Sequence, residues 1–203
     1  MFRNSILEIF SQTWPMILIC TVIIVSMRII YIIKNKKEFI FYKELMMLLF
    51  IIYVMCMFYV VTFQDVSWSS SNYIPFKEMF RYEFGSRLFF KNVIGNMIMF
   101  LPYGFFVSYF LKIDKKKMIL ILSVITSFTI EFTQLKIGRV FDIDDILLNV
   151  LGGMIGYFLY IFLTKVQDRL PKFLKKPIFY NIMVLAILVI FILYLTNYLK
   201  LGV

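Results

Sequence analysis

The chain has 203 residues, of which 62% are hydrophobic and 17% are charged, and its mean hydropathy is +0.86. Soluble globular domains carry about a quarter of charged residues, so this composition excludes a soluble domain and indicates an integral membrane protein. The net charge is +10, but the basic residues fall in short clusters between apolar runs, which favours topology signals over nucleic-acid binding. Histidine is absent, which excludes histidine bases and histidine metal ligands. Cys20 and Cys56 lie in apolar runs, which argues against a disulfide framework or a thiolate metal site.

Six apolar runs are long enough to cross a bilayer as helices. About twenty residues, at a rise of ~1.5 Å each, span the ~30 Å of bilayer hydrocarbon. The runs are Trp14–Ile33, Leu45–Phe63, Asn92–Leu111, Met118–Ile137, Asp145–Thr164 and Ile178–Leu199. We therefore predict an all-α, polytopic transmembrane helix bundle with six transmembrane helices.

The connections divide this bundle into three predicted parts. Residues 1–71 hold two transmembrane helices and their connection, residues 72–164 form the membrane core, and residues 165–203 hold a basic connection and the last helix. Residues 64–91 mix aromatic and basic side chains, so we expect them to lie along the membrane surface or to dip back into the protein. A plain surface loop is the alternative for this segment.

Lysine and arginine in the connections predict the orientation. With the N-terminus outside, the inner connections hold 13 of these residues and the outer ones hold 8. Because basic residues accumulate on the cytoplasmic side, we predict a multi-pass protein of the bacterial plasma membrane with both termini outside.

Polar side chains are set into or against the third, fourth and fifth apolar runs. Such groups cost several kcal/mol each in hydrocarbon when they are unpaired, so their presence needs a reason. Spacings of three or four residues place them on shared helix faces, and the predicted orientation places them toward the outer side. We expect them to form one outward-facing polar site, made of Asn92, Asn96, Glu131, Gln134, Arg139, Asp142, Asp144, Asp145 and Asn149.

Small residues predict where the helices pack. Gly152 and Gly156 in the fifth run have the small-xxx-small spacing that lets another helix approach closely in lipid. We expect the partner to be the third or the fourth run. The predicted packing residues are Pro102, Gly104, Gly152, Gly153 and Gly156. Pro102 also predicts a bend in the third run, since proline removes one backbone hydrogen bond.

Two structural alternatives to the polar site stay open. Asp142 and Asp144 can act at the start of the fifth helix, where an N-cap or an acid in the first turn complements the helix dipole. Capping does not explain the residues inside the runs, which are Asn96, Glu131 and Asn149; for these the alternative is an interhelical hydrogen-bond cluster. An oxygen-ligated metal is conceivable, but Arg139 and the missing histidines argue against it, so we expect no metal and no cofactor.

Three motifs cover about the middle half of the chain. They are NYIPF at Asn72–Phe76, NVIGNMIMFLPYG at Asn92–Gly104, and EFTQLKIGRVFDIDDILLNVLGGMIGY at Glu131–Tyr157. In these motifs the sequence resembles the VanZ-like family of bacterial membrane proteins, named for the teicoplanin-resistance protein of glycopeptide-resistance clusters. The resemblance implies a role at the cell envelope, with low-level teicoplanin resistance in some members.

Two functions fit these observations. The first is a non-enzymatic membrane protein that alters how a lipoglycopeptide or a lipid-linked envelope precursor engages the outer leaflet. The second is an intramembrane enzyme or carrier acting on a lipid- or polyprenyl-linked head group, with Glu131 and Asp145 as acid and base. The first ranks higher because the sequence supplies no nucleophile, phosphate-binding glycine loop or metal set. A transporter ranks third, since the two halves show no internal repeat. The expected partners are the lipid bilayer and such a ligand, not nucleic acid.

Overall fold

The computed structural model describes residues 2–63 and 71–200. In these ranges the protein is helical, and its one β-type pairing is an isolated bridge between Asn72 and Asp142. The elements are α1 (Phe2–Lys34), α2 (Phe41–Phe63), α3 (Arg87–Phe89), the π-helix η1 (Phe90–Ile94), α4 (Gly95–Leu111), α5 (Lys116–Lys136), α6 (Ile143–Arg169) and α7 (Pro177–Lys200). The predicted all-α class is confirmed.

Six helical segments are long and apolar enough to cross a membrane. They are Ser11–Lys34, Phe41–Phe63, Arg87–Leu111, Lys116–Lys136, Ile143–Arg169 and Pro177–Tyr194. The prediction of six spanning helices is therefore confirmed by length and composition. The helix that holds the first segment starts at Phe2, before the apolar run, because residues 2–13 contain no glycine or proline to end it.

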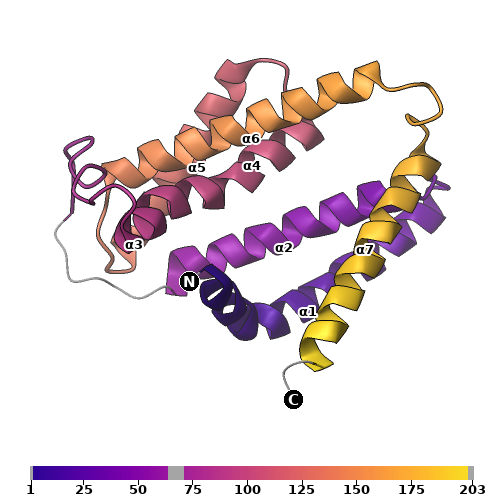
Figure 1. Cartoon of the computed structure of the whole chain (residues 1–203), viewed down its shortest axis with the longest axis horizontal. Coiled ribbons are helices and arrows are strands. Elements are labelled where there is room, and N and C mark those ends of the chain that lie inside the picture. Colours follow the sequence, from indigo (N-terminus) through magenta and orange to yellow (C-terminus); the bar gives the residue numbers. More distant parts are fainter. Residues whose placement is uncertain (1, 64–70, 201–203) are drawn as a thin grey trace.

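Helices α4, α5 and α6 form the packed part of the molecule. They lie together in the upper part of Figure 1, whereas α2 crosses the middle of the view, and most of α1 and of α7 lies below or to the right of it. In the most apolar 18-residue stretch of each of these three spans, 28%, 33% and 33% of the residues are buried. The corresponding shares in α1, α2 and α7 are 6%, 6% and 0%. The buried core consists of Phe100, Tyr103, Ile113, Ile119 and Tyr157. Most of the buried polar side chains therefore lie on α4, α5 and α6, and the others among the described residues are Thr13 of α1 and Asn72.

Glycines bring the backbones of α4 and α6 into direct contact. A Cβ added at Gly104 would collide with the backbone of Gly153, and one added at Gly156 would collide with the backbone of Leu101. Similarly, a Cβ at Gly152 would collide with the backbone of Met97. The partner of the small-xxx-small face is thus the third span. Pro102 lies on this helix, and α4 continues through it.

The outer helices are held by a few polar contacts. Arg28 of α1 and Glu44 of α2 form an ion pair, with Nε and Oε2 2.7 Å apart. Tyr53 of α2 donates a hydrogen bond to the Met99 carbonyl of α4 at 2.9 Å. The side chain of Asn181 in α7 accepts a hydrogen bond from the Tyr42 backbone N–H at the start of α2. These contacts connect α2 to α1, α4 and α7.

The segment before α3 folds back onto the start of α6. Residues 64–70, which belong to the segment predicted to follow the membrane surface, lie outside the described residues. Residues 71–86 form turns and irregular structure around the Asn72 bridge, and Figure 1 shows this part of the chain beside the N-terminal end of α6. Helical structure then begins at Arg87, earlier than predicted, because the Ser86 hydroxyl caps it by accepting a hydrogen bond from the Phe89 N–H.

Candidate functional site at the start of helix α6

Asp142 is the N-cap of α6. Its Oδ1 accepts hydrogen bonds from the Asp144 backbone N–H and from the Asn72 side-chain amide, each at 2.9 Å. The two backbones are also paired, because the Asn72 N–H donates to the Phe141 carbonyl and the Ile143 N–H donates to the Asn72 carbonyl. Asn72 thus fixes the entry of the chain into α6.

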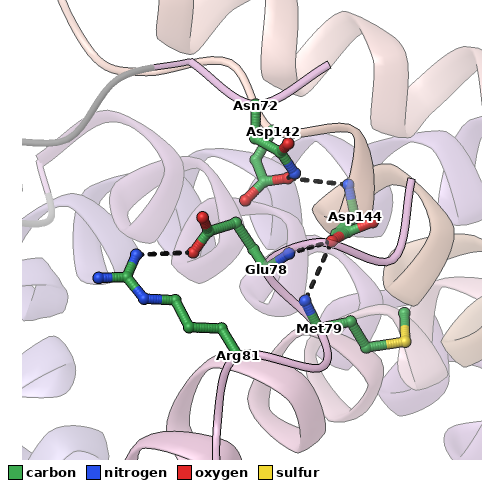
Figure 2. A network of polar contacts seen from close by, with 6 residues as sticks. All are labelled: Asn72, Glu78, Met79, Arg81, Asp142 and Asp144. Carbon is green, nitrogen blue, oxygen red and sulfur yellow. Dashed lines mark hydrogen bonds and ion pairs between the residues drawn. The ribbon is translucent and has the colours of Figure 1, made fainter. Parts of the chain in front are cut away.

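Asp144 holds the loop that follows Asn72. Its side chain is 1% exposed and accepts three backbone hydrogen bonds, from Phe76 at 2.5 Å, Glu78 at 2.8 Å and Met79 at 3.0 Å. Figure 2 shows the bonds to Glu78 and Met79, with the Arg81–Glu78 ion pair beside them. A carboxylate that receives several backbone N–H groups is stabilised in its charged form. The charge of Asp144 therefore has a structural use.

Asp142 makes a pH-dependent contribution to the stability of the protein. Burial raises the pKa of its carboxyl group, and the hydrogen bonds from Asn72 and Asp144 oppose that rise only in part. A carboxyl group whose pKa is raised by folding lowers stability above the folded pKa, and this cost disappears below the unfolded pKa. The ionised form of Asp142 thus reduces stability at neutral pH.

We therefore expect Asp142→Asn to be as stable as the native chain at neutral pH, or more stable. The asparagine oxygen can accept both hydrogen bonds, because both now end on Oδ1. The gain should shrink as the pH falls through the folded pKa, where native Asp142 becomes protonated. Thermal unfolding of both proteins in detergent between about pH 4 and 8 checks this. A gain that grows at low pH would contradict it; Asp142→Ala, which loses the cap, should be less stable throughout.

Glu131 is buried at the end of α5 and faces the same loop. It is 2% exposed, and its Oε2 accepts a hydrogen bond from the Asp142 backbone N–H at 3.0 Å. When the Gln134 amide is oriented to satisfy its neighbours, its nitrogen donates to Glu131 Oε1 at 3.0 Å and its oxygen accepts from Arg139 at 3.2 Å. Arg139 also donates to the Val61 carbonyl of α2 at 2.7 Å. Gln134 therefore lies between the carboxylate and the guanidinium, which form no direct ion pair.

Two further polar pairs cross between the helices. Asn96 of α4 donates to Asp145 of α6 at 2.5 Å, and Asn149 of α6 donates to Ser127 of α5 at 3.0 Å. Asn149 is 2% exposed, and its side-chain oxygen is buried without a partner. Asp145 lies within electrostatic reach of the carboxylates of Glu131, Asp142 and Asp144. The three core helices thus each contribute polar groups to one region.

The comparison with protein families covers this region. The family model described as VanZ/LLP1 matches residues 50–164, which is more than half of the chain. The chain belongs to the VanZ/LLP1 family. No curated protein and no solved structure matches it. The match starts within α2 and ends near the C-terminal end of α6, so the VanZ/LLP1 region contains the whole polar region and the core helices that build it.

Within this VanZ/LLP1 region, most of the predicted site residues meet at one end of the core. We call this set the α6 N-terminal cluster: Asn72, Asn96, Glu131, Gln134, Arg139, Asp142, Asp144 and Asp145. Asn149 lies one turn deeper in α6 and binds Ser127 instead. Asn92 lies in η1, and its side chain makes no hydrogen bond to any residue that the structure describes.

Asn72 is the cluster residue that the site prediction missed. It lies in the NYIPF motif, which supported the family resemblance but was assigned no role. The same motif region supplies the backbone N–H groups that bind Asp144.

The hydrogen bonds that Asp144 accepts from this loop weigh against it as a metal ligand. Among the described residues no group of three or more acidic or cysteine side chains is arranged to hold a metal ion.

The charges of the cluster are unbalanced. Glu131, Asp142, Asp144 and Asp145 bring four carboxylates together, and Arg139 is the nearby cation. The two ion pairs among the described residues, Arg28–Glu44 and Arg81–Glu78, include none of these four carboxylates. Glu131 and Asp144 are buried, and Asp142 and Asp145 are half-buried. Carboxyl groups buried without an ion pair are expensive, and they mark functional positions in membrane proteins. The cluster can therefore offer negative charge, hydrogen-bond acceptors or a proton to a ligand.

Proposed function

We propose that this VanZ-like membrane protein acts at the cell envelope of a bacterium, at the outer leaflet of the plasma membrane. There the α6 N-terminal cluster contacts the polar part of a lipoglycopeptide or of a lipid-linked envelope precursor. The outcome is low-level resistance to teicoplanin. Membership of the VanZ/LLP1 family supports this proposal, and the carboxyl groups of Glu131 and Asp145 carry it.

The carboxyl groups of Glu131 and Asp145 accept fewer hydrogen bonds than the carboxyl group of Asp144. Asp144 receives three backbone N–H groups, whereas Asp145 receives one hydrogen bond, from the neutral amide of Asn96. Glu131 receives one backbone N–H group and one from the Gln134 amide. A neutral amide side chain would satisfy most of these contacts without the cost of a buried charge. A ligand or a proton that uses the charge accounts for the carboxylates.

Drug sensitivity tests the proposal directly. The gene is deleted and re-expressed, and the lowest inhibitory concentrations of teicoplanin and of vancomycin, which lacks a lipid tail, are compared. We expect the re-expressed protein to raise the teicoplanin value a few-fold and to leave the vancomycin value unchanged. Equal protection against both drugs, or protection against neither, would contradict an action at the depth of the lipid tail.

The proposed sidedness gives a separate prediction. In a background without the two native cysteines, single cysteines at Lys37 and Lys172 should react only with reagents inside the cell. Single cysteines at Phe84 and Lys136 should react only with membrane-impermeant reagents added outside. All four positions are exposed on the protein, so burial inside the fold does not limit the reaction. Reversed labelling in intact cells would place the cluster at the inner leaflet and end the proposal.

Catalysis on a lipid- or polyprenyl-linked head group is the second candidate function. The observation that favours it is the proximity of two carboxyl groups in different surroundings, the buried Glu131 with two hydrogen bonds and the half-buried Asp145 with one. Different surroundings let one carboxyl group act as acid and the other as base. Mass spectrometry of lipid-linked precursors from expressing and deleted cells separates the candidates, because only an enzyme changes their masses.

A further inference from the structure

A second polar region lies at the opposite end of α5 and α6. It is a cavity of about 480 Å³ at the turn between α4 and α5, bordered by the C-terminal part of α6. We call it the lysine pocket, and its lining residues are Asp114, Lys115, Lys116, Lys117, Tyr157, Phe158, Ile161 and Lys165. Glu131 lies near the end of α5 and Asp145 near the start of α6, so the lysine pocket is separate from the α6 N-terminal cluster.

Positive charge dominates the lysine pocket. Four lysines border it, three from the start of α5 and Lys165 from α6, against the single acid Asp114. No described ion pair includes any of these five side chains. The N-terminus of α5 adds partial positive charge, and no side chain caps it. The surroundings therefore favour an anion.

The frame of the lysine pocket is fixed by packing. Ile113 is 2% exposed within the core, and its N–H donates to the Ser108 carbonyl at the end of α4. The buried Tyr157 of α6 donates its hydroxyl hydrogen bond to the Asp114 carbonyl at 2.8 Å. These contacts attach the α4–α5 turn to α6, so the lysines of the turn and Lys165 stay beside one cavity.

An apolar wall adjoins the lysines. Phe158 and Ile161 precede Lys165 at helical spacings of seven and four residues, so the three share one face of α6. Phe158 is 54% exposed in a segment apolar enough to lie in lipid. The pocket thus changes from basic to apolar along the axis of α6, as the bilayer does from its head groups to its chains.

We propose that the lysine pocket binds the phosphate head group of an anionic phospholipid, with an acyl chain along Phe158 and Ile161. Basic pockets between transmembrane helices bind anionic lipid head groups in this way. The volume of the cavity is in the range that ligand pockets have. In the orientation proposed above, the bound lipid belongs to the inner leaflet, opposite the α6 N-terminal cluster.

Lipid binding by the purified full-length protein tests this proposal. The native chain in neutral detergent is titrated with short-chain phosphatidylglycerol, with phosphatidylcholine and with inorganic phosphate, and bound lipid is counted by native mass spectrometry. The test variant carries Gln at Lys115, Lys116 and Lys117. The matched control carries Gln at Lys34, Lys36 and Lys37, which removes the same charge from another connection on the same side.

We expect the native chain to bind phosphatidylglycerol at least about tenfold more tightly than phosphatidylcholine. The lysines attract the net negative charge of the phosphatidylglycerol head group, whereas the phosphatidylcholine head group has no net charge. The test triple should lose about tenfold or more, the control triple less than about twofold, and Lys165→Gln alone roughly fivefold. Lys165 comes from α6 and is exposed, so its replacement leaves the turn intact if the triple variant folds poorly.

Three results would overturn the proposal. Equal losses of phosphatidylglycerol affinity in the two triple variants would mean that the lipid is attracted by the overall positive charge of the protein and not by the lysine pocket. Displacement of phosphatidylglycerol by inorganic phosphate at similar concentration would identify a free-anion site without a lipid chain. Native affinity in Lys165→Gln would show that Lys165 of α6 takes no part in binding the head group.

Discussion

Alanine at Gly104 is expected to reduce folded protein sharply. The added Cβ would lie inside the backbone of Gly153 on α6, and backbone atoms cannot move aside as the end of a flexible side chain can. The two helices would have to separate along the contact that Gly104, Gly152 and Gly156 make possible. Overpacking of this kind costs about 1–3 kcal/mol or more, a large part of the stability of a small protein.

Gly95→Ala is the matched control on the same helix. A Cβ at Gly95 meets only the Phe90 carbonyl oxygen, at the ordinary contact distance of 3.6 Å. Since alanine favours the helix by roughly 0.5–1 kcal/mol over glycine, this variant should be as stable as the native chain or more stable. Membrane yield and thermal unfolding in detergent measure both variants. Equal behaviour of Gly104→Ala and Gly95→Ala would show that close approach of α4 and α6 does not limit stability.

The helix contact shows what the sequence can and cannot predict. Spacing alone indicated that the glycine face of α6 packs closely, because the small-xxx-small pattern is local. It left the partner open between the third and fourth spans, since the fourth span also has small residues. In the structure α5 contributes Ser123, which lies against Gly153, while the backbone of α4 lies against Gly152 and Gly156, and Gly104 of α4 lies against the backbone of Gly153. The choice of partner depends on tertiary packing, which no local pattern contains.

The acidic residues of α6 show the same limit. Capping by Asp142 was open from the sequence, and the structure supports it through the bond from the Asp144 N–H. The binding of residues 76–79 by Asp144 joins positions 65 to 68 residues apart and involves only backbone donors. A backbone N–H group is present in every residue except proline, so side-chain patterns carry no signal of this contact. The sequence therefore could not separate Asp144 from the candidate site.

Glu131→Gln is expected to abolish teicoplanin protection while the protein still accumulates and folds. The glutamine oxygen can accept the Asp142 N–H, and its amide nitrogen can donate to Gln134 once that amide turns over. In that orientation the Gln134 nitrogen faces the Val61 carbonyl at 3.5 Å, and Arg139 loses its hydrogen bond to Gln134 but keeps the one to the Val61 carbonyl at 2.7 Å. The shape and most hydrogen bonds survive and a buried charge disappears, so stability should be unchanged or slightly higher.

Loss of function at normal abundance would then identify the charge, not the fold, as what the activity needs. Asp145→Asn should act in the same way from α6, since its oxygen can still accept from Asn96. Glu131→Leu cannot replace these variants, because it leaves the Asp142 N–H and Gln134 without a partner and would damage a purely structural cluster as well. Protein levels, thermal unfolding and teicoplanin sensitivity are measured on the same membranes and strains. Native protection by Glu131→Gln at equal expression would leave the α6 N-terminal cluster with the single role of joining α4, α5 and α6.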